Sequence, residues 1–235
     1  VLLCDDDIVI EPESINRLLT FASYCVRPTL VGGHMFDLYN RAALHTMGEV
    51  VNPWRFQPDK PVADQVTGYD LGVTNLRSTP WMHRRIDADY NGWWMELIPT
   101  SVIREIGLGL PVFIKWDDVE FGLRAKAAGY ATVSLPGAAV WHISWGDKDD
   151  LVGWQAYFHE RNRFITALLH SPYARGGRLV RESNYMDVKH LISMQYYTEA
   201  GRLMALHDIL AGPDQLHDIL DERIKQIRTM AGEHS

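Results

Sequence analysis

Strand-like and helix-like segments alternate along about the first 145 of the 235 residues. Short apolar runs predict strands at residues 1–4, 29–38, 131–135 and 138–143, and a helical pattern covers residues 13–24. A chain with this alternation is expected to form a layered α/β structure, in which helices cover the faces of a sheet. The alternation therefore restricts the fold more than any other feature of the sequence.

The sequence changes character after the last predicted strand, because helical periodicity dominates from there. Residues 151–170 predict one long helix. A further apolar stripe near the end consists of Leu216, Ile219, Leu220, Ile227 and Met230. We therefore expect two domains, 1–149 and 150–235, with the mainly helical second domain packed on the first.

Residues 48–91 are rich in Pro, Asp and Asn and show little periodicity, which indicates a long functional loop.

Composition excludes several classes of protein. The net charge of −7 argues against broad nucleic-acid binding, which needs a basic surface. Two cysteines, Cys4 and Cys25, are too few for a disulfide framework. The sequence has no apolar run of the roughly 20 residues that a membrane span needs, so we expect no membrane span, and we expect no signal peptide in it. Because it starts inside a predicted strand and without a methionine, we expect it to be a piece of a longer protein.

Three adjacent aspartates, Asp5 to Asp7, follow the first predicted strand directly. In an extended chain Asp5 and Asp7 point to the same face. The carboxyl ends of parallel strands are where open α/β sheets bind ligands. Two carboxylates on one face suit a hard divalent cation, which could also hold a diphosphate. A solvated acidic turn that caps the next helix is the alternative.

A second acidic motif lies in the segment WDDVE. Asp117 occupies a predicted N-cap position and Glu120 follows three residues later, which is the spacing of a capping box. Gly129 is expected to end this helix. Asp118 lies in the first turn, where the helix dipole favours an ionised carboxylate of the kind that a general base requires. The pattern alone leaves base and cap equally open for Asp118.

A histidine and an adjacent pair of tryptophans complete the candidate groups. His142 stands in a small-residue strand between Trp141 and Trp145, as either a structural histidine or a metal ligand. Imidazole suits manganese and other transition ions, so His142 could join Asp5 and Asp7 in a three-point site. Trp93 and Trp94 offer indole faces for a sugar, and we expect one of the two to lie in the core.

Six segments occur in the order CDDD, LHTMGEVV, HRRIDADYNGWW, FIKWDD, LPGAAVWH and WQAYFHERNR. Together they resemble the actinobacterial galactofuranosyltransferases that polymerise the galactan of arabinogalactan, from Val1 to about Arg163 and more loosely beyond. The resemblance implies an inverting family 2 glycosyltransferase of the GT-A fold, with a mixed sheet, helices on both of its faces and a helical C-terminal region. It also implies that uridine-binding strands and a β-rich domain precede this sequence in the whole protein.

The resemblance further implies substrates, a cofactor and a location. The donor would be UDP-galactofuranose, the cofactor Mn²⁺ or Mg²⁺, and the acceptor a lipid-linked galactan. The enzyme would be cytoplasmic and peripheral to the inner face of the plasma membrane. Arg175, Arg178 and Arg181 are candidates for contact with anionic lipid headgroups, with plain solvation as the alternative. Linkage, polymer length and oligomeric state, including a homo-oligomer, stay open.

Residue roles follow from the resemblance position by position. Asp5 and Asp7 correspond to metal-binding acids, His142 to the third metal ligand and Asp118 to the catalytic base. Positions that match the donor or acceptor pocket are Glu49, Trp54, Trp93, Trp94, Lys115, Asp117 and His159. Around Trp54 the sequence is shorter than the family pattern.

Two other functions fit parts of the sequence. A haloacid-dehalogenase-type phosphohydrolase also carries a strand that ends in D-x-D, with the first aspartate as nucleophile. However, Ile8 and Val9 replace its usual Gly-Thr, and that function does not account for the tryptophans. A non-catalytic carbohydrate-binding or assembly module is the third candidate.

Overall fold

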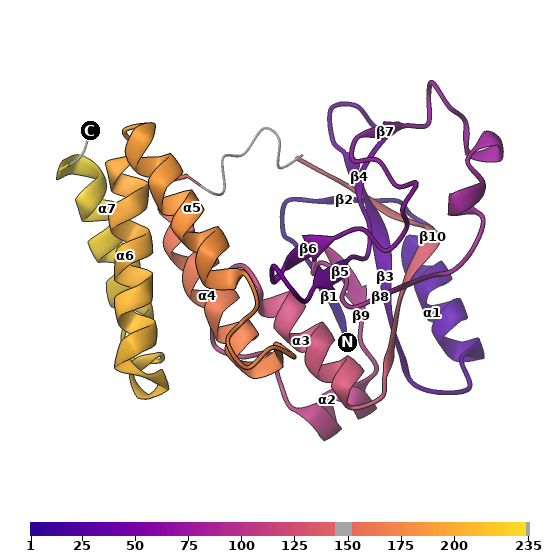
Figure 1. Ribbon diagram of the computed structural model, residues 1–235. Coiled ribbons are helices and arrows are strands. Elements are labelled where there is room, and N and C mark those ends of the chain that lie inside the picture. Colours follow the sequence, from indigo (N-terminus) through magenta and orange to yellow (C-terminus); the bar gives the residue numbers. More distant parts are fainter. Residues whose placement is uncertain (144–151, 234–235) are drawn as a thin grey trace. The chain divides into compact units, whose positions relative to one another are not determined.

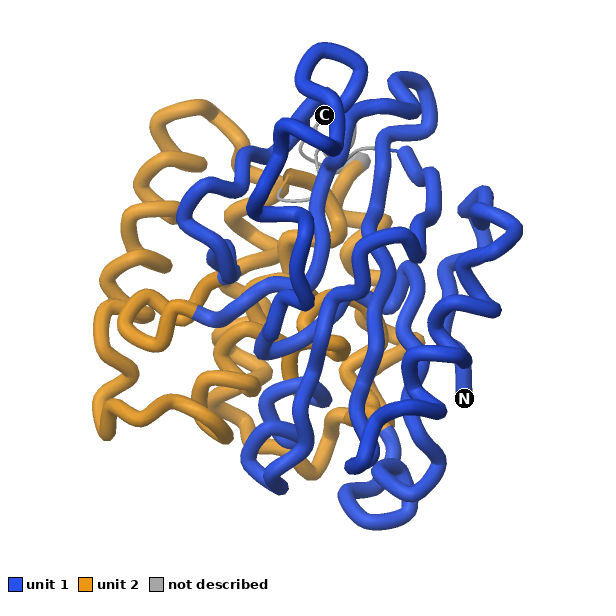
Figure 2. The backbone as a smooth tube through the Cα atoms, turned by 90° about the vertical axis from the view of Figure 1, so that its right-hand side faces the viewer, with its two compact units in different colours: residues 1–51, 58–108, 121–148 blue, residues 52–57, 109–120, 149–235 orange. Residues whose placement is uncertain are grey.

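The computed structural model describes residues 1–143 and 152–233 (Figure 1). The chain divides into two compact units, shown in different colours in Figure 2. Unit 1 comprises residues 1–51, 58–108 and 121–148, and unit 2 comprises residues 52–57, 109–120 and 149–235. The domain boundary expected between residues 149 and 150 lies outside the described residues, as does Trp145.

Eight strands of the described residues form one mixed sheet in unit 1. Its main order is β1-β9-β3-β10-β2, while β4 pairs with β3 and β7, and β8 pairs with β10. The strands are β1 Leu2–Cys4, β2 Val9–Ile10, β3 Thr29–Asp37, β4 Ala43–Thr46, β7 Tyr69–Asp70, β8 Ile86–Ala88, β9 Met95–Leu97 and β10 Ala131–His142. A separate two-stranded sheet joins β5 Val50–Asn52 to β6 Gln57–Asp59.

Helices cover both faces of the large sheet. On one face Leu18 of α1 (Ser14–Tyr24) packs with Val31 and Val133. On the other face Leu30 packs with α2 (Thr100–Ile106) and with Phe121 of α3 (Asp117–Ala127). Adjacent residues 30 and 31 face opposite sides because side chains alternate along a strand. The expected α/β architecture is confirmed.

Two of the predicted elements differ from the structure. The runs expected to be two strands around Pro136 are one strand, β10, which pairs with β3 on both sides of a register shift between Ser134 and Ala139. A bulge absorbs the Pro-Gly pair there, with Gly137 at φ 89°. The segment expected to be a long loop, residues 48–91, contains β5 to β8 and the short 3₁₀-helices η1 (Leu76–Ser78) and η2 (Pro80–Met82).

The C-terminal part of unit 2 is helical, as expected. Its helices are α4 Gln155–His170, α5 Leu179–Ile192, α6 Tyr196–Ala211 and α7 Leu220–Glu233, with the 3₁₀-helix η4 at Pro213–Gln215. Tyr157 and Phe158 pack with Ala205 and with Ile227 of the predicted apolar stripe. The predicted long helix begins at Gln155, four residues later than expected.

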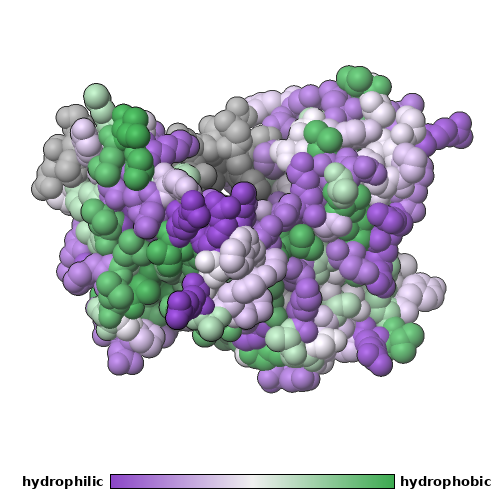
Figure 3. All heavy atoms as spheres, viewed as in Figure 1, coloured by the Kyte–Doolittle hydropathy of each residue, from purple (hydrophilic) through white to green (hydrophobic). Residues whose placement is uncertain are grey.

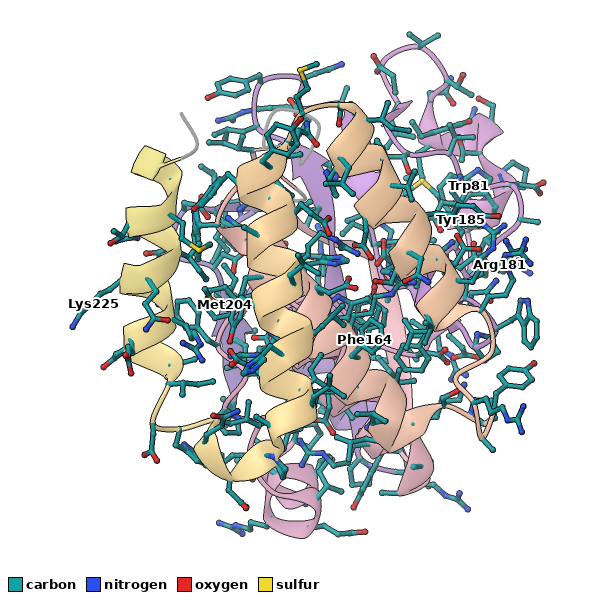
Figure 4. All side chains as sticks on the ribbon, turned by 60° about the vertical axis from the view of Figure 1, so that its left-hand side comes forward. Trp81, Phe164, Arg181, Tyr185, Met204 and Lys225 are labelled. Atoms are coloured by element: carbon teal, nitrogen blue, oxygen red, sulfur yellow. The ribbon has the colours of Figure 1, made fainter. Side chains whose placement is uncertain are left out.

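Polar and apolar side chains also remain on the surface of unit 2. Apolar side chains gather over its helices on the face shown in Figure 3. On α5 the Arg181 guanidinium lies over the Tyr185 ring (Figure 4). On the opposite side of Figure 4, Lys225 points away from α7. Within the described residues, no helix has both the length and the apolar character of a membrane span.

Candidate active site

Strand directions bring Asp5, Asp7 and His142 together. β9 is antiparallel to both β1 and β3, while β10 is parallel to β3. β1 and β10 therefore point the same way, so Asp5 and His142 lie at the same edge of the sheet. β2 then runs back along β10, with Val9 opposite Trp141. This antiparallel register places Asp7, two residues before Val9, beside His142.

The three side chains form a compact group, which we call the metal cluster. Nε2 of His142 lies 2.9 Å from Oδ1 of Asp7 and 3.6 Å from Oδ2 of Asp5. One potential ligand atom of each residue lies within 4.8 Å of those of the other two. The three side chains lie together as expected, but the extended backbone expected for Asp5 to Asp7 was wrong. β1 ends at Cys4 and the aspartates lie in a turn rather than in an extended strand.

β1 is a strand, as predicted, but it is more exposed than its apolar sequence indicates. It stands at one end of the described sheet order, Leu2 and Leu3 are partly exposed, and Cys4 is exposed. An end position explains this exposure because β1 has its described partner, β9, on one side. The side chains of Asp5 and Asp7 are about half exposed, whereas that of His142 is 6% exposed. The acids therefore stand where an ion from solvent can reach them.

The donor set of the metal cluster fits a divalent cation. Nδ1 of His142 lies 2.7 Å from the carbonyl oxygen of Ile143. When Nδ1 carries the proton and donates it to this carbonyl, the lone pair of Nε2 faces the two carboxylates. Two oxygen donors and one imidazole nitrogen suit Mn²⁺, and the carboxylates alone suit Mg²⁺.

Trp93 and Trp94 pack in different parts of unit 1. Trp94 is buried, and its indole N–H donates to the carbonyl of Gly33 at 2.9 Å. Trp93 is partly buried against Phe121, and its indole N–H donates to Oε2 of Glu96 at 3.0 Å. Trp94 is therefore the expected core member of the pair. Trp93 retains an exposed part that could contact a ligand.

Glu96 is a buried acid that supports Trp93. Its Oε1 accepts a hydrogen bond from Nδ2 of Asn91 at 2.9 Å. Burial raises the pKa of Glu96 to about 7, against the opposing effect of the hydrogen bonds from Asn91 and Trp93. Asn91 comes close enough because Gly32 of β3 has no side chain, and a Cβ there would lie 2.1 Å from the Asn91 side chain.

Glu49, another predicted pocket residue, is held at the start of the segment 48–91. Its carboxylate accepts hydrogen bonds from the hydroxyls of Tyr90 and Thr46. Burial raises the pKa of Glu49, while both hydrogen bonds act to lower it. The backbone pairs Glu49 with Tyr90 in an isolated bridge, so the two ends of this segment meet.

The second acidic motif opens α3, and its first turn belongs to unit 2. The helix begins at Asp117, and the Trp116 carbonyl accepts the hydrogen bond of the Glu120 N–H at 2.9 Å. Trp116 rather than Asp117 is therefore at the capping position, which corrects the predicted N-cap. Asp118 lies in the first turn as expected, where its Oδ1 accepts from the Val119 N–H at 2.7 Å. The positive end of the helix dipole favours its ionised form.

Lys115, Trp116 and His159 surround the start of this helix within unit 2. The Trp116 ring meets the His159 ring edge-on, with centroids 5.8 Å apart. Burial lowers the pKa of His159 to about 3, and the positive charges of Arg163 and Lys115 contribute. A neutral imidazole can accept a hydrogen bond from a sugar hydroxyl.

Trp54 lies elsewhere in unit 2. Its ring meets the Tyr173 ring edge-on, with centroids 5.0 Å apart, and its carbonyl accepts from the Arg178 N–H at 2.7 Å. About half of Trp54 is exposed. Its assignment to an acceptor pocket stays a prediction, as do the assignments of Glu49, Trp93, Trp94, Lys115, Asp117 and His159.

Sequence reasoning gave no role to Glu96, Arg161 or Asn162. Glu96 accepts a hydrogen bond from Trp93, Asn162 donates one to the Lys115 carbonyl, and Arg161 donates one to the nearby Val112 carbonyl. Glu96 lies close to the tryptophan pair in sequence, and a lone acid between Met95 and Leu97 was a usable signal. Arg161 and Asn162 lie in the segment WQAYFHERNR, but their contacts are with residues 47 to 50 positions earlier. No local pattern reports contacts of that separation.

Comparison with known proteins identifies the family. Residues 1–167 match the model of glycosyltransferase like family 2. The chain belongs to this family. Residues 179–235 match a further model, described as galactofuranosyltransferase-2, domain 3. The resemblance inferred from the six segments is therefore confirmed.

Two curated relatives have the same printed name, galactofuranosyltransferase GlfT2. The protein from Mycobacterium tuberculosis is 46% identical over 233 residues, which cover 97% of this chain and 36% of the relative. The protein from Mycolicibacterium smegmatis is 43% identical over 238 residues, which cover 100% of this chain and 37% of the relative. The chain thus spans about a third of the length of these relatives.

Proposed function

We propose that this chain carries the metal-binding and general-base residues of an inverting galactofuranosyltransferase. The enzyme would move galactofuranose from UDP-galactofuranose to a growing lipid-linked galactan in cell-wall synthesis. The metal cluster of Asp5, Asp7 and His142 is the observation that carries this proposal, because its two carboxylates and one imidazole are a donor set that suits a divalent cation, in a chain of glycosyltransferase like family 2. The names of the two relatives support the choice of sugar.

Asp5, Asp7 and His142 would hold a Mn²⁺ or Mg²⁺ ion. When bound, such an ion supplies positive charge that offsets the negative charge developing on a leaving diphosphate. The two carboxylates contribute negative charge for the cation, and His142 adds a nitrogen donor oriented by the Ile143 carbonyl.

Asp118 would act as the general base. It takes the proton of an acceptor hydroxyl while that oxygen attacks the anomeric carbon. The new bond forms as the bond from the anomeric carbon to the diphosphate breaks, and the electron pair leaves on UDP. A single displacement of this kind inverts the anomeric centre. Neutral His159 and the exposed part of Trp93 would bind sugar hydroxyls and C–H faces.

The proposal extends to the cellular setting of the reaction. A lipid-linked acceptor would place the enzyme in the cytoplasm, peripheral to the inner face of the plasma membrane. Arg175, Arg178 and Arg181 are the candidates for headgroup contact. The alternative is a haloacid-dehalogenase-type phosphohydrolase, in which Asp5 would be a covalent nucleophile. The match to glycosyltransferase like family 2 favours the transferase over this alternative.

Acceptor-dependent UDP release by the full-length protein tests the proposal. We expect release from UDP-galactofuranose only with a galactan acceptor, loss of release with EDTA, and recovery with Mn²⁺ or Mg²⁺. Phosphate release from small phosphoesters instead would indicate the phosphohydrolase. Acceptor binding without UDP release, in the presence of metal, would indicate a carbohydrate-binding module.

A further inference from the structure

The segment that leads into α3, residues 112–116, has a constrained backbone, and we call it the entry segment. Phe113, Lys115 and Trp116 have φ angles of 74°, 67° and 68°. Residues with a Cβ disfavour this left-handed region for steric reasons. Three such residues within four positions do not adopt this conformation through local preference. Surrounding contacts must therefore hold it.

The contacts that hold the entry segment come from α4. Nδ2 of Asn162 donates to the carbonyl oxygens of Val112, Ile114 and Lys115 at 2.9, 2.7 and 2.8 Å. Nη2 of Arg161 also donates to the Val112 carbonyl, at 2.9 Å. The side chains of Arg161 and Asn162 are both completely buried, and the bonds to Val112 are buried while those to Ile114 and Lys115 are partly buried. One amide group thus fixes three carbonyls of the entry segment.

The side chain of Asn162 is itself held in one orientation. Its Oδ1 accepts from Nε of Arg161 at 2.9 Å, which leaves Nδ2 toward the carbonyls. The Arg161 guanidinium lies over the rings of Tyr157 and Phe158, 5.2 and 5.1 Å from their centroids. A buried cation in this position is stabilised by the ring faces as well as by its hydrogen bonds.

A chain of hydrogen bonds continues from Arg161 to α7. Nη1 of Arg161 donates to the Tyr157 hydroxyl at 3.2 Å, and this hydroxyl donates to Oδ2 of Asp208 at 2.6 Å. Nε and Nη2 of Arg223 each bind a different oxygen of Asp208 at 2.7 Å. The helices α6 and α7 therefore support Arg161, and through it the entry segment.

We propose that Asn162, braced by Arg161, is the positioning residue for Asp118. This inference rests on the proposed role of Asp118 as general base. Asp118 comes three residues after Lys115, the last residue whose carbonyl Asn162 holds, so a shift of the entry segment moves the start of α3. A base has to lie within hydrogen-bonding distance of the proton that it takes.

The decisive variant is Asn162→Asp in the full-length protein. It keeps the side-chain shape but replaces the donating amide nitrogen by an oxygen that repels the three carbonyls. A misplacement of about 1 Å can cost about 10²-fold in rate. We expect kcat for acceptor-dependent UDP release to fall about 10²-fold, while the KM for UDP-galactofuranose and the Mn²⁺ affinity change less than about threefold. Deuterium exchange of residues 112–118 should become faster.

Ser183→Ala is the matched control. Ser183 is also buried in unit 2, but its hydroxyl bonds to Glu160 and Arg202. This variant should lose stability without a change in kcat or in the exchange of residues 112–118. Asn162→Ser, which keeps one donor, serves as a second variant in case Asn162→Asp does not fold.

The outcomes separate the two proposals. A wild-type enzyme without acceptor-dependent transfer would overturn the proposed function. An active wild type, with unchanged kcat in whichever Asn162 variant folds, would overturn only the positioning role. Equal loss of kcat in Ser183→Ala would also overturn it, because general destabilisation would then explain the effect.

Discussion

The metal cluster of unit 1 and the entry segment of unit 2 are held in place by different kinds of interaction. Backbone pairing of β2 with β10 places Asp7 beside His142, and the two aspartates remain about half exposed. In the entry segment, a buried amide and a buried guanidinium hold backbone carbonyls in a conformation that the chain does not prefer.

The difference has consequences for mutation. A cluster positioned by strand pairing should keep its backbone when one of its side chains is removed, so only ligand binding is lost. A segment positioned by buried side chains should move when those side chains change, even though they touch no substrate. Variants of the two regions should therefore lose different properties.

The largest effect is expected for Asp118→Ala in the full-length enzyme. Removal of a general base typically costs about 10²–10⁴-fold in rate, whereas the loss of one charge near a helix N-terminus costs about 0.3–1 kcal/mol of stability. Acceptor-dependent UDP release should therefore nearly vanish, while Mn²⁺ binding and the melting temperature change little.

Asp117→Ala provides the control for this prediction, because Asp117 occupies the same helical turn. It should have a similar effect on stability and a smaller effect on rate. Near wild-type turnover in Asp118→Ala, or a loss that only follows unfolding, would mean that Asp118 is not the base.

His142→Ala tests the metal cluster. Changes around a metal ligand already cost about 10–100-fold in affinity, so the loss of a ligand should weaken Mn²⁺ binding by at least about 10²-fold. Calorimetric titration with Mn²⁺ measures this change. Deuterium exchange in the entry segment should stay the same, since that segment depends on α4.

Asp6→Asn is the matched variant of the same acidic turn, because Asp6 is exposed between the two proposed ligands. It should leave Mn²⁺ affinity nearly unchanged. If His142→Ala binds Mn²⁺ as tightly as the wild type, the proposed three-residue site is wrong.

Glu96→Gln tests whether the buried carboxyl group that accepts the Trp93 hydrogen bond in unit 1 changes its protonation near neutral pH. The pKa of Glu96 is raised from 4.5 to about 7. Between these values the unfolded chain has lost its proton while the folded chain retains it, so stability falls as pH rises. Above pH 7 this decrease stops. The whole effect amounts to at most about 3 kcal/mol at 1.36 kcal/mol per pKa unit.

Glutamine does not titrate, so Glu96→Gln should lose less stability than the wild type between pH 5 and pH 8. Denaturant unfolding at both pH values measures the difference. Asp64→Asn, at an exposed position of the same unit, should behave like the wild type. An equal pH dependence in Glu96→Gln and the wild type would show that Glu96 does not titrate in this range.

The amino-acid sequence by itself determined the α/β class and the helical C-terminal part, and it singled out Asp5, Asp7 and His142, whose side chains the structure brings together. The first two features follow from apolar periodicity, and the choice of the three residues follows from shared ligand chemistry and from the resemblance carried by the six segments. The aspartates lie in a turn after Cys4 rather than in an extended strand, yet Asp7 still lies beside His142 because of the register of β2 on β10.

Only the tertiary structure decided what supports these groups. The bulge in β10, the core position of Trp94 and the bonds from Asn162 to the entry segment all depend on neighbours distant in sequence. Periodicity reports which face of an element is apolar, but it carries no information about which buried donor meets which carbonyl. That pairing is set when the elements pack, since an unpaired buried polar group costs stability and most such groups therefore pair in the space that remains.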